Sequence, residues 1–312
     1  MDYVLGIDIG TTAVKAMLID NDGKNMVKST VEYPLFFPHA GWAEQSPEDL
    51  WQAVVTAVDR VLDRFSGDRK DIRALSLSTQ RDTLICTDSQ GSPLRNAITW
   101  MDSRSGEQCA RLEREVGAAR VYEITGVPVS TIWTLAFILW LREKEPDIFG
   151  RTACFGLVHD FVLCRLGAGR HFLDVSNACQ TMLFDLSGGM WSDELMRYSG
   201  LGKERLPELV EPGTVVGTLN ETLCRRWGMG KVALVSGGGD QQCAALGAGA
   251  VSAGDVETGI GTAANLLAVC DRPVLDPLRR MVCHRAAVPG LWVLEGAMLA
   301  TGKLMEWVRA EL

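Results

Sequence analysis

Three short segments of the chain combine acidic, hydroxyl and glycine residues in patterns that could bind a phosphate or an alcohol. In the first, Asp8 precedes Gly10, Thr11 and Thr12, and Lys15 follows shortly after. Glycine lets a turn approach a ligand closely, and the exposed amides of such a turn form a nest for an anion. A carboxylate is unfavourable beside a phosphate unless a cation lies between them, so the pattern indicates a Mg²⁺-bound phosphate. An ordinary β-turn capped by Asp8 explains the same residues.

The second segment places an acid after three glycines. Gly237, Gly238 and Gly239 follow an apolar run and precede Asp240, where a helix is predicted to begin. Three consecutive glycines cost chain entropy, which indicates that something packs tightly against their backbone. Asp240 could be a general base at the mouth of a cleft, or only the N-cap of the helix. An acid at a helix start is more often a cap.

The third segment is Gln80-Arg81-Asp82, between two apolar β-prone runs. Arginine offers several fixed donors and aspartate accepts them, so Arg81 and Asp82 side by side could grip vicinal hydroxyls. A structural ion pair is the alternative. Trp100 could supply an apolar wall for a sugar ring, although a tryptophan is more often part of the core.

The elements around these segments alternate between strands and helices, which favours an α/β architecture. An antiparallel meander is predicted to open the chain, and Ser46-Pro47 offers an N-cap and a first helical residue for the helix that ends before Gly67. Strands are predicted at residues 3–7, 13–19, 27–33, 72–78, 83–87 and 232–236; further helices are predicted at 102–116, 131–143, 160–166, from about 241, and at 297–309.

A short internal sequence similarity suggests a duplicated unit. Residues 7–13 and 259–264 both contain a Gly-Thr turn between two β-prone runs. The match is short, but a strand–turn–strand unit that occurs early and again late is typical of a duplicated fold.

Composition limits the class of protein. The chain has 312 residues, a length that favours two domains or one large domain with part of another. Its hydrophobic fraction of 47% is typical of a folded globular protein. The net charge of −8 argues against a nucleic-acid-binding surface. Nine scattered cysteines without a C-x-x-C pair fit buried thiols in a reducing compartment. The N-terminus does not have the pattern of a signal peptide, and the longest apolar run, residues 131–141, is too short to span a membrane. A cytoplasmic protein without a membrane partner is therefore expected.

Taken in order, six segments resemble the FGGY family of carbohydrate kinases, which includes glycerol kinases and xylulokinases. The resemblance implies an actin-like ATPase fold of two ribonuclease H-like domains around a cleft. It implies a complete sugar-binding domain at residues 1–247, and at 248–312 the start of a nucleotide-binding domain that is incomplete. The six segments are residues 6–12, 41–45, 79–83, 96–102, 237–242 and 259–262.

The resemblance also implies an activity: ATP-dependent phosphorylation of a hydroxyl of a small sugar or polyol, with Mg²⁺. Asp240 would be the general base and would also contact the substrate, and Asp8 would lie near the metal. Phosphoryl transfer requires positioning and charge stabilisation more than covalent chemistry, which fits these residue types. The remaining roles implied are a first phosphate loop at Gly10, Thr11, Thr12 and Lys15, a second at Gly261 and Thr262, and substrate contacts at Gln80, Arg81, Asp82 and Trp100.

Three departures from the family pattern leave the sugar open. Phe137 stands where the family usually has a lysine, Ile132 where glycerol kinases have a tyrosine, and Arg81-Asp82 where xylulokinases typically have Met-His. Family members also continue beyond Leu312, so a truncated kinase is expected. A second hypothesis is a catalytically impaired sugar-binding or regulatory fragment of such a kinase. Homodimers are common in the family and are expected here only on that ground.

Overall fold

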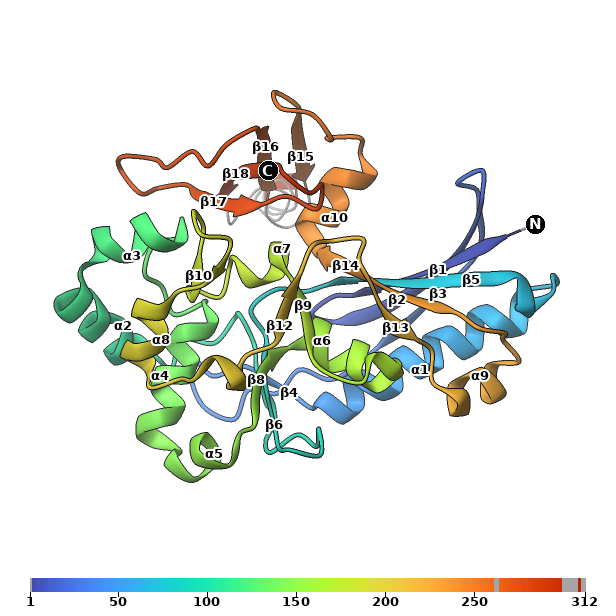
Figure 1. Ribbon diagram of the computed structural model, residues 1–312, viewed down its shortest axis with the longest axis horizontal. Helices are drawn as coiled ribbons and strands as arrows, with labels where there is room; N and C mark the ends of the chain where they lie inside the picture. Colours follow the sequence, from blue (N-terminus) through green and yellow to red (C-terminus); the bar gives the residue numbers. More distant parts are fainter. Residues whose placement is uncertain (1, 261–263, 299–307, 310–312) are drawn as a thin grey trace.

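A six-stranded mixed sheet forms the centre of the molecule (Figure 1). The computed structural model describes residues 2–260, 264–298 and 308–309. The first three strands form the antiparallel meander predicted from the sequence, and β5 and β14 then run parallel to β1. This arrangement confirms the α/β fold class and the ribonuclease H-like start that the resemblance implies. In sheet order, the strands are β13 (Val215–Thr218), β14 (Ala233–Gly239), β5 (Ile72–Thr79), β1 (Tyr3–Ile9), β2 (Ala13–Asp20) and β3 (Asn25–Glu32).

Helix α1 (Pro47–Arg64) packs against β2 and β3 and begins as its sequence predicts. The Ser46 hydroxyl accepts a hydrogen bond from the Asp49 amide at 3.1 Å, and Pro47 is the first helical residue. Apolar residues at helical spacing, among them Leu50, Val54 and Val58, are fully buried against the sheet. Each such burial contributes roughly 1.5–3 kcal/mol. Helices α6 (Val158–Leu163) and α9 (Glu221–Trp227) contribute to the same core.

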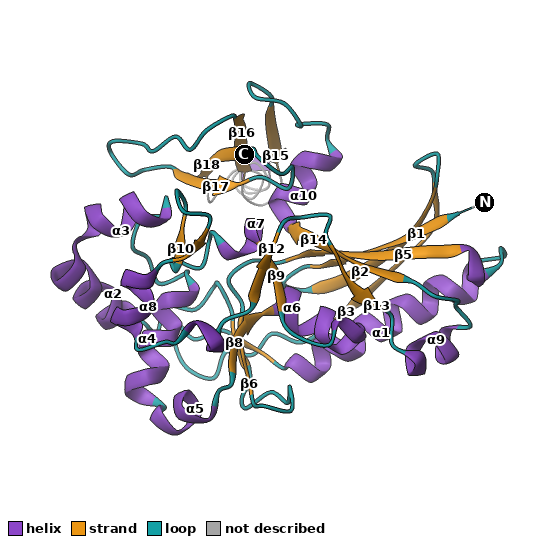
Figure 2. Cartoon of the chain, in the orientation of Figure 1, coloured by secondary structure: helices purple, strands orange, loops and turns teal. Residues whose placement is uncertain are grey.

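A second core lies beside the central sheet, where most of the remaining helices gather (Figure 2). A small sheet of order β4-β7-β6-β8 connects this helical part to the central sheet. Its strands are β4 (Glu44–Gln45), β6 (Leu84–Thr87), β7 (Ala97–Ile98) and β8 (Cys154–Leu157). The other elements here are α2 (Gly106–Leu112), α3 (Ala118–Thr125), α4 (Thr134–Lys144), α5 (Pro146–Arg151), α7 (Val175–Ala178), α8 (Asp193–Ser199), β9 (Phe172–Asp174), β10 (Phe184–Asp185), β11 (Met190–Trp191) and β12 (Glu208–Val210).

A separate antiparallel sheet follows helix α10 (Asp240–Gly247), in the order β15-β16-β18-β17. Its first two strands form the second hairpin predicted from the sequence, although the turn residues Gly261 and Thr262 lie outside the described residues. The sheet contacts the helical part through α3, because the Gly126 carbonyl accepts from the Cys283 amide at 2.9 Å. The strands are β15 (Val256–Ile260), β16 (Ala264–Cys270), β17 (Val282–Arg285) and β18 (Trp292–Met298).

Several predicted boundaries were wrong. The helix expected from residue 102 begins only at Gly106, and the one expected from residue 297 does not begin there, because Ala297 and Met298 still belong to β18. Most of that expected helix, residues 299–307, lies outside the described residues. None of the described helices is long and apolar enough to cross a membrane.

Candidate functional site

The candidate site lies where three parallel strands end side by side. Ile9, Thr79 and Gly239 are in register at the carboxyl ends of β1, β5 and β14. The residues that follow these ends are the Gly-Thr turn, the Gln80–Asp82 loop and Asp240. The structure therefore brings together, at one edge of one sheet, the three segments singled out in the sequence. Ligands of α/β proteins commonly bind at this edge.

The glycine run continues β14 instead of forming a loop, and it lies tightly against its neighbours. A Cβ at Gly237 would lie 1.7 Å from the Leu77 carbonyl oxygen, and one at Gly238 would lie 2.9 Å from Ser176 Oγ. At Gly239 it would lie 2.9 Å from Arg81 Cδ. The prediction that something packs against this backbone is confirmed, and the close approach brings Arg81 to the start of α10.

Asp240 is the first residue of α10, and Gly239 is the N-cap, so the alternative that Asp240 caps the helix was wrong. Its carboxylate accepts a hydrogen bond from the Gln241 amide at 2.8 Å, and Arg81 Nε lies 3.6 Å from the same oxygen. The side chain is 34% exposed. Burial raises the pKa of Asp240 and the Arg81 guanidinium opposes that rise; the charge of Asp8 is also close enough to raise it. These contacts leave a carboxylate oxygen within reach of an incoming hydroxyl.

Arg81 and Asp82 do not form the simple side-by-side pair that their sequence suggests. Both Nη atoms of Arg81 bind the carboxylate of Glu295 on β18, at 2.9 and 3.0 Å. Asp82 has φ 53°, is buried, and accepts from the Thr134 hydroxyl at 3.1 Å. Burial raises the pKa of Asp82 to about 8 although Arg81 acts to lower it, so this acid is mostly protonated at neutral pH. A buried neutral acid can still donate to a hydroxyl oxygen.

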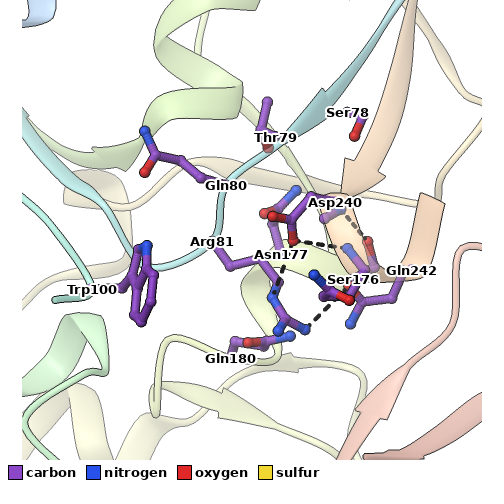
Figure 3. A network of polar contacts seen from close by, with 12 residues as sticks. Ser78, Thr79, Gln80, Arg81, Trp100, Ser176, Asn177, Gln180, Asp240 and Gln242 are labelled. Carbon is purple, nitrogen blue, oxygen red and sulfur yellow. Dashed lines mark hydrogen bonds and ion pairs between the residues drawn. The ribbon is translucent and has the colours of Figure 1, made fainter. Parts of the chain in front are cut away.

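Gln80 and Trp100 both connect to the Gly-Thr turn. The Gln80 amide donates to the Tyr33 hydroxyl at 3.1 Å and to Gln45 Oε1 at 2.9 Å, and Gln45 donates to the Thr11 carbonyl at 2.5 Å. Trp100 is 41% exposed, so it is not a core residue, and its indole N–H donates to Thr11 Oγ1 at 3.0 Å. Figure 3 shows Trp100 across Arg81 from Asp240 and Gln242. The Gln80 amide group is therefore already hydrogen-bonded within the protein. The substrate role expected for Gln80 stays a prediction.

The turn after β1 has free groups suited to an anion. No hydrogen bond within the described residues uses the amides of Thr11 and Thr12 or the Thr12 hydroxyl. Asp8 accepts from Ser78 Oγ at 2.9 Å and from Lys15 Nζ at 3.3 Å, and its carboxylate is 36% exposed. Free amides, a partly exposed carboxylate and a nearby lysine fit a phosphate with its metal ion.

Sequence reasoning missed a supporting layer beneath Asp240. Asp174 caps α7 by accepting from the amides of Ser176 and Asn177, at 2.9 and 3.1 Å. Ser176 Oγ in turn accepts from the Gly239 amide at 3.0 Å, which fixes the end of β14. Asn177 Oδ1 and Gln242 Nε2 are buried without a partner in the described part of the chain (Figure 3). The Asp174–Asn177 sequence carries only the signal of a helix cap, so nothing in it points to the site.

The fold is the actin-like α/β fold expected from the sequence. The N-terminal domain of the FGGY family of carbohydrate kinases matches residues 3–247, and the chain belongs to that family. The xylulose kinase of Bacillus subtilis is 33% identical over 310 residues, which cover 99% of this chain and 62% of that protein.

Solved structures give the same result. The ligand-bound xylulose kinase of Lactobacillus acidophilus superposes with a TM-score of 0.94 at 26% identity, covering all of this chain and 63% of the other. The gluconate kinase of the same organism gives 0.93 at 26% identity, covering 99% and 62%. The chain thus spans less than two thirds of the length of these relatives.

Proposed function

We propose that this protein transfers the γ-phosphoryl group of ATP to a hydroxyl of a small sugar or polyol, with Asp240 as the general base. The observation that carries the proposal is the partly exposed Asp240 carboxylate, held beside Arg81 and on the same sheet edge as the Gly-Thr turn. The relatives named above are kinases of xylulose, a sugar, and of gluconate, a sugar acid, which supports a small polyhydroxylated acceptor.

In this proposal each segment has one task. The turn at Gly10, Thr11 and Thr12 binds phosphate oxygens through its amides and hydroxyls, and Lys15 adds positive charge. Asp8 would hold Mg²⁺, which when bound neutralises phosphate charge. Asp240 orients the acceptor hydroxyl and takes its proton as the new P–O bond forms. The expected second phosphate loop, Gly261 and Thr262, remains part of the proposal.

The acceptor is proposed to lie between Asp240, Arg81 and Trp100. The indole face would cover an apolar side of the carbon chain, and the buried neutral Asp82 would donate to a hydroxyl oxygen. Asn177 and Gln242 each have a polar atom that no described residue binds, and these atoms could bind further hydroxyls. Domain limits of 1–247 for sugar binding and 248 onward for nucleotide binding are part of the same proposal.

Asp240→Asn tests the base. This variant should lower sugar-dependent ADP release by a factor of about 10²–10⁴ while sugar binding, measured by calorimetry, changes little. Asp193→Asn is the matched control, because Asp193 is also the first residue of a short helix but is exposed in α8. Normal turnover by Asp240→Asn would show that another group accepts the proton.

The alternative is a sugar-binding protein with impaired catalysis. Sugar binding without MgATP binding or turnover by the 312-residue chain would select it. Turnover that depends on both MgATP and sugar would exclude it.

A further inference from the structure

The guanidinium of Arg81 is occupied by a carboxylate from the second sheet. Glu295 on β18 takes both Nη atoms in a bidentate pair, while Arg81 itself follows β5 of the central sheet. The two side chains are only 15% and 7% exposed. Bidentate pairs of this kind are the strongest and most directional ion pairs of arginine. Arg81 Nε lies 3.6 Å from Asp240 Oδ1, and Nη1 also donates to Gln242 Oε1 at 3.4 Å.

The other groups near Glu295 do not add positive charge. His284 Nδ1 lies 3.3 Å from Glu295 Oε2, but burial lowers the pKa of His284, so this imidazole is neutral at pH 7. Burial opposes ionisation of Glu295, yet Arg81 outweighs it and holds the pKa of Glu295 well below its usual range. The next residue of β17, Arg285, pairs with Glu211 at 3.1 Å. Glu295 is therefore a carboxylate, and among the described residues Arg81 is the cation that pairs with it.

The charges around Asp240 therefore favour a neutral acceptor. Asp82 is mostly uncharged at neutral pH, and the charged side chains with the largest effects on Asp240 are Arg81, Asp8 and Glu295. Asp8 is paired with Lys15 at 3.3 Å and Glu295 with Arg81 at 2.9 Å, so the negative charge of Asp240 is the one in excess within this set. A sugar acid placed here would meet unpaired negative charge and would find both Nη atoms of Arg81 already taken.

We propose that Glu295 is a specificity-determining residue: by occupying Arg81, it makes the acceptor site select neutral polyols and ketoses and reject aldonates. The proposal rests on the proposed sugar-kinase function and adds the charge of the acceptor to it. Glu295 acts through Arg81 and need not touch the sugar. Without the charge of Glu295, the Nη atoms of Arg81 would face neutral acceptors such as Gln242 Oε1 at 3.4 Å, and the carboxylate of an aldonate would be the stronger bidentate partner.

The test compares acceptors of the same carbon number in which one terminal CH₂OH is replaced by a carboxylate, by calorimetry with the full chain. Xylitol and ribitol are each paired with the aldonate of the same carbon number, xylonate and ribonate. Wild type should bind xylitol or ribitol, or both, at least about tenfold more tightly than the corresponding aldonate. Glu295→Gln keeps the size of the side chain and removes its charge, and it should move the ratio of the two dissociation constants toward the aldonate by about ten- to a hundredfold. Glu208→Gln is the control, because Glu208 pairs with Arg170 at 2.7 Å on the surface.

The outcomes separate the two proposals. Equal or tighter binding of the aldonates by wild type would overturn the role of Glu295 and leave the kinase proposal standing. An unchanged ratio in a Glu295→Gln variant that gives a wild-type circular dichroism spectrum would also overturn it. Should that variant not fold, the wild-type ratio still decides, and Glu295→Asp, which keeps the charge, should retain the preference for neutral acceptors. If neither class of ligand binds, the proposed function fails and this inference fails with it.

Discussion

Gly237→Ala is the most direct test of how the fold holds the site. The added Cβ would lie 1.7 Å from the Leu77 carbonyl oxygen and 3.0 Å from Ser76 Oγ, whereas non-bonded carbon contacts are about 3.5–4.0 Å. The main obstacle is backbone of the neighbouring strand, so no side-chain rotation can relieve it. Overpacking costs about 1–3 kcal/mol and occasionally more, and this case should reach at least about 3 kcal/mol. Because Gly237 is three residues before Asp240, the shift of β14 should also displace the carboxylate.

The assay is urea unfolding monitored by tryptophan fluorescence, and sugar binding is measured on the same protein preparations. Gly247→Ala is the matched control: it adds the same methyl group at the last residue of α10, where a Cβ meets nothing within 4 Å. It should leave the free energy of unfolding unchanged or raise it by up to about 1 kcal/mol. A Gly237→Ala variant within 1 kcal/mol of wild type by this assay would refute the close approach of β14 to β5.

Two further predictions concern the acceptor pocket. The pKa of Asp82 is about 8 in the native state, but it lies near the ordinary value of an aspartate, about 4, in the unfolded chain. Between pH 4 and 8 the native state therefore binds more protons at this residue than the unfolded state does. As pH rises through this range, Asp82 should lower the free energy of unfolding by up to about 1.4 kcal/mol per pH unit. Asp82→Asn should flatten that slope in urea unfolding at pH 5, 6, 7 and 8; parallel slopes would mean that Asp82 is ionised in the native state. Trp100→Ala should weaken sugar binding roughly three- to tenfold, whereas Trp100→Phe should retain most of it, because the ring face and not the indole N–H would contact the sugar. Equal losses in calorimetry would assign the effect to the hydrogen bond with Thr11.

The local patterns of this sequence were sufficient to predict the central elements of the fold. The meander, α1 and the late hairpin follow from alternating apolar residues, a Ser-Pro helix start and paired Gly-Thr turns. The glycine run before Asp240 correctly predicted a close backbone contact. These features depend on nearby residues, so a single sequence carries them. The ends of helices were predicted less accurately. Residues 102–105 could have extended α2 but instead lie in the loop that precedes it.

The partners of the site residues could not be predicted, because they come from distant parts of the chain. Arg81 and Glu295 are 214 positions apart, and their pairing depends on how the second sheet sits over the first. The sequence suggested that Arg81 and Asp82 lie side by side, either to bind hydroxyls or as an ion pair, yet the turn at Asp82 directs its side chain to Thr134. Gln80 likewise looked available for a ligand, although Gln45 and Tyr33 use its amide.

The register of three strands explains why the site residues act together. Ile9, Thr79 and Gly239 are aligned by parallel pairing, so the next residue of each strand emerges at the same edge. A slip of one residue in a strand reverses the faces of its side chains and would turn polar residues toward the buried core. The buried apolar residues of β1 and β5 therefore fix the register, and the register places the Gly-Thr turn beside Arg81 and Asp240. It follows that substitutions in the core of this sheet should impair sugar and nucleotide binding together, whereas changes at Glu295 should alter the choice of acceptor alone.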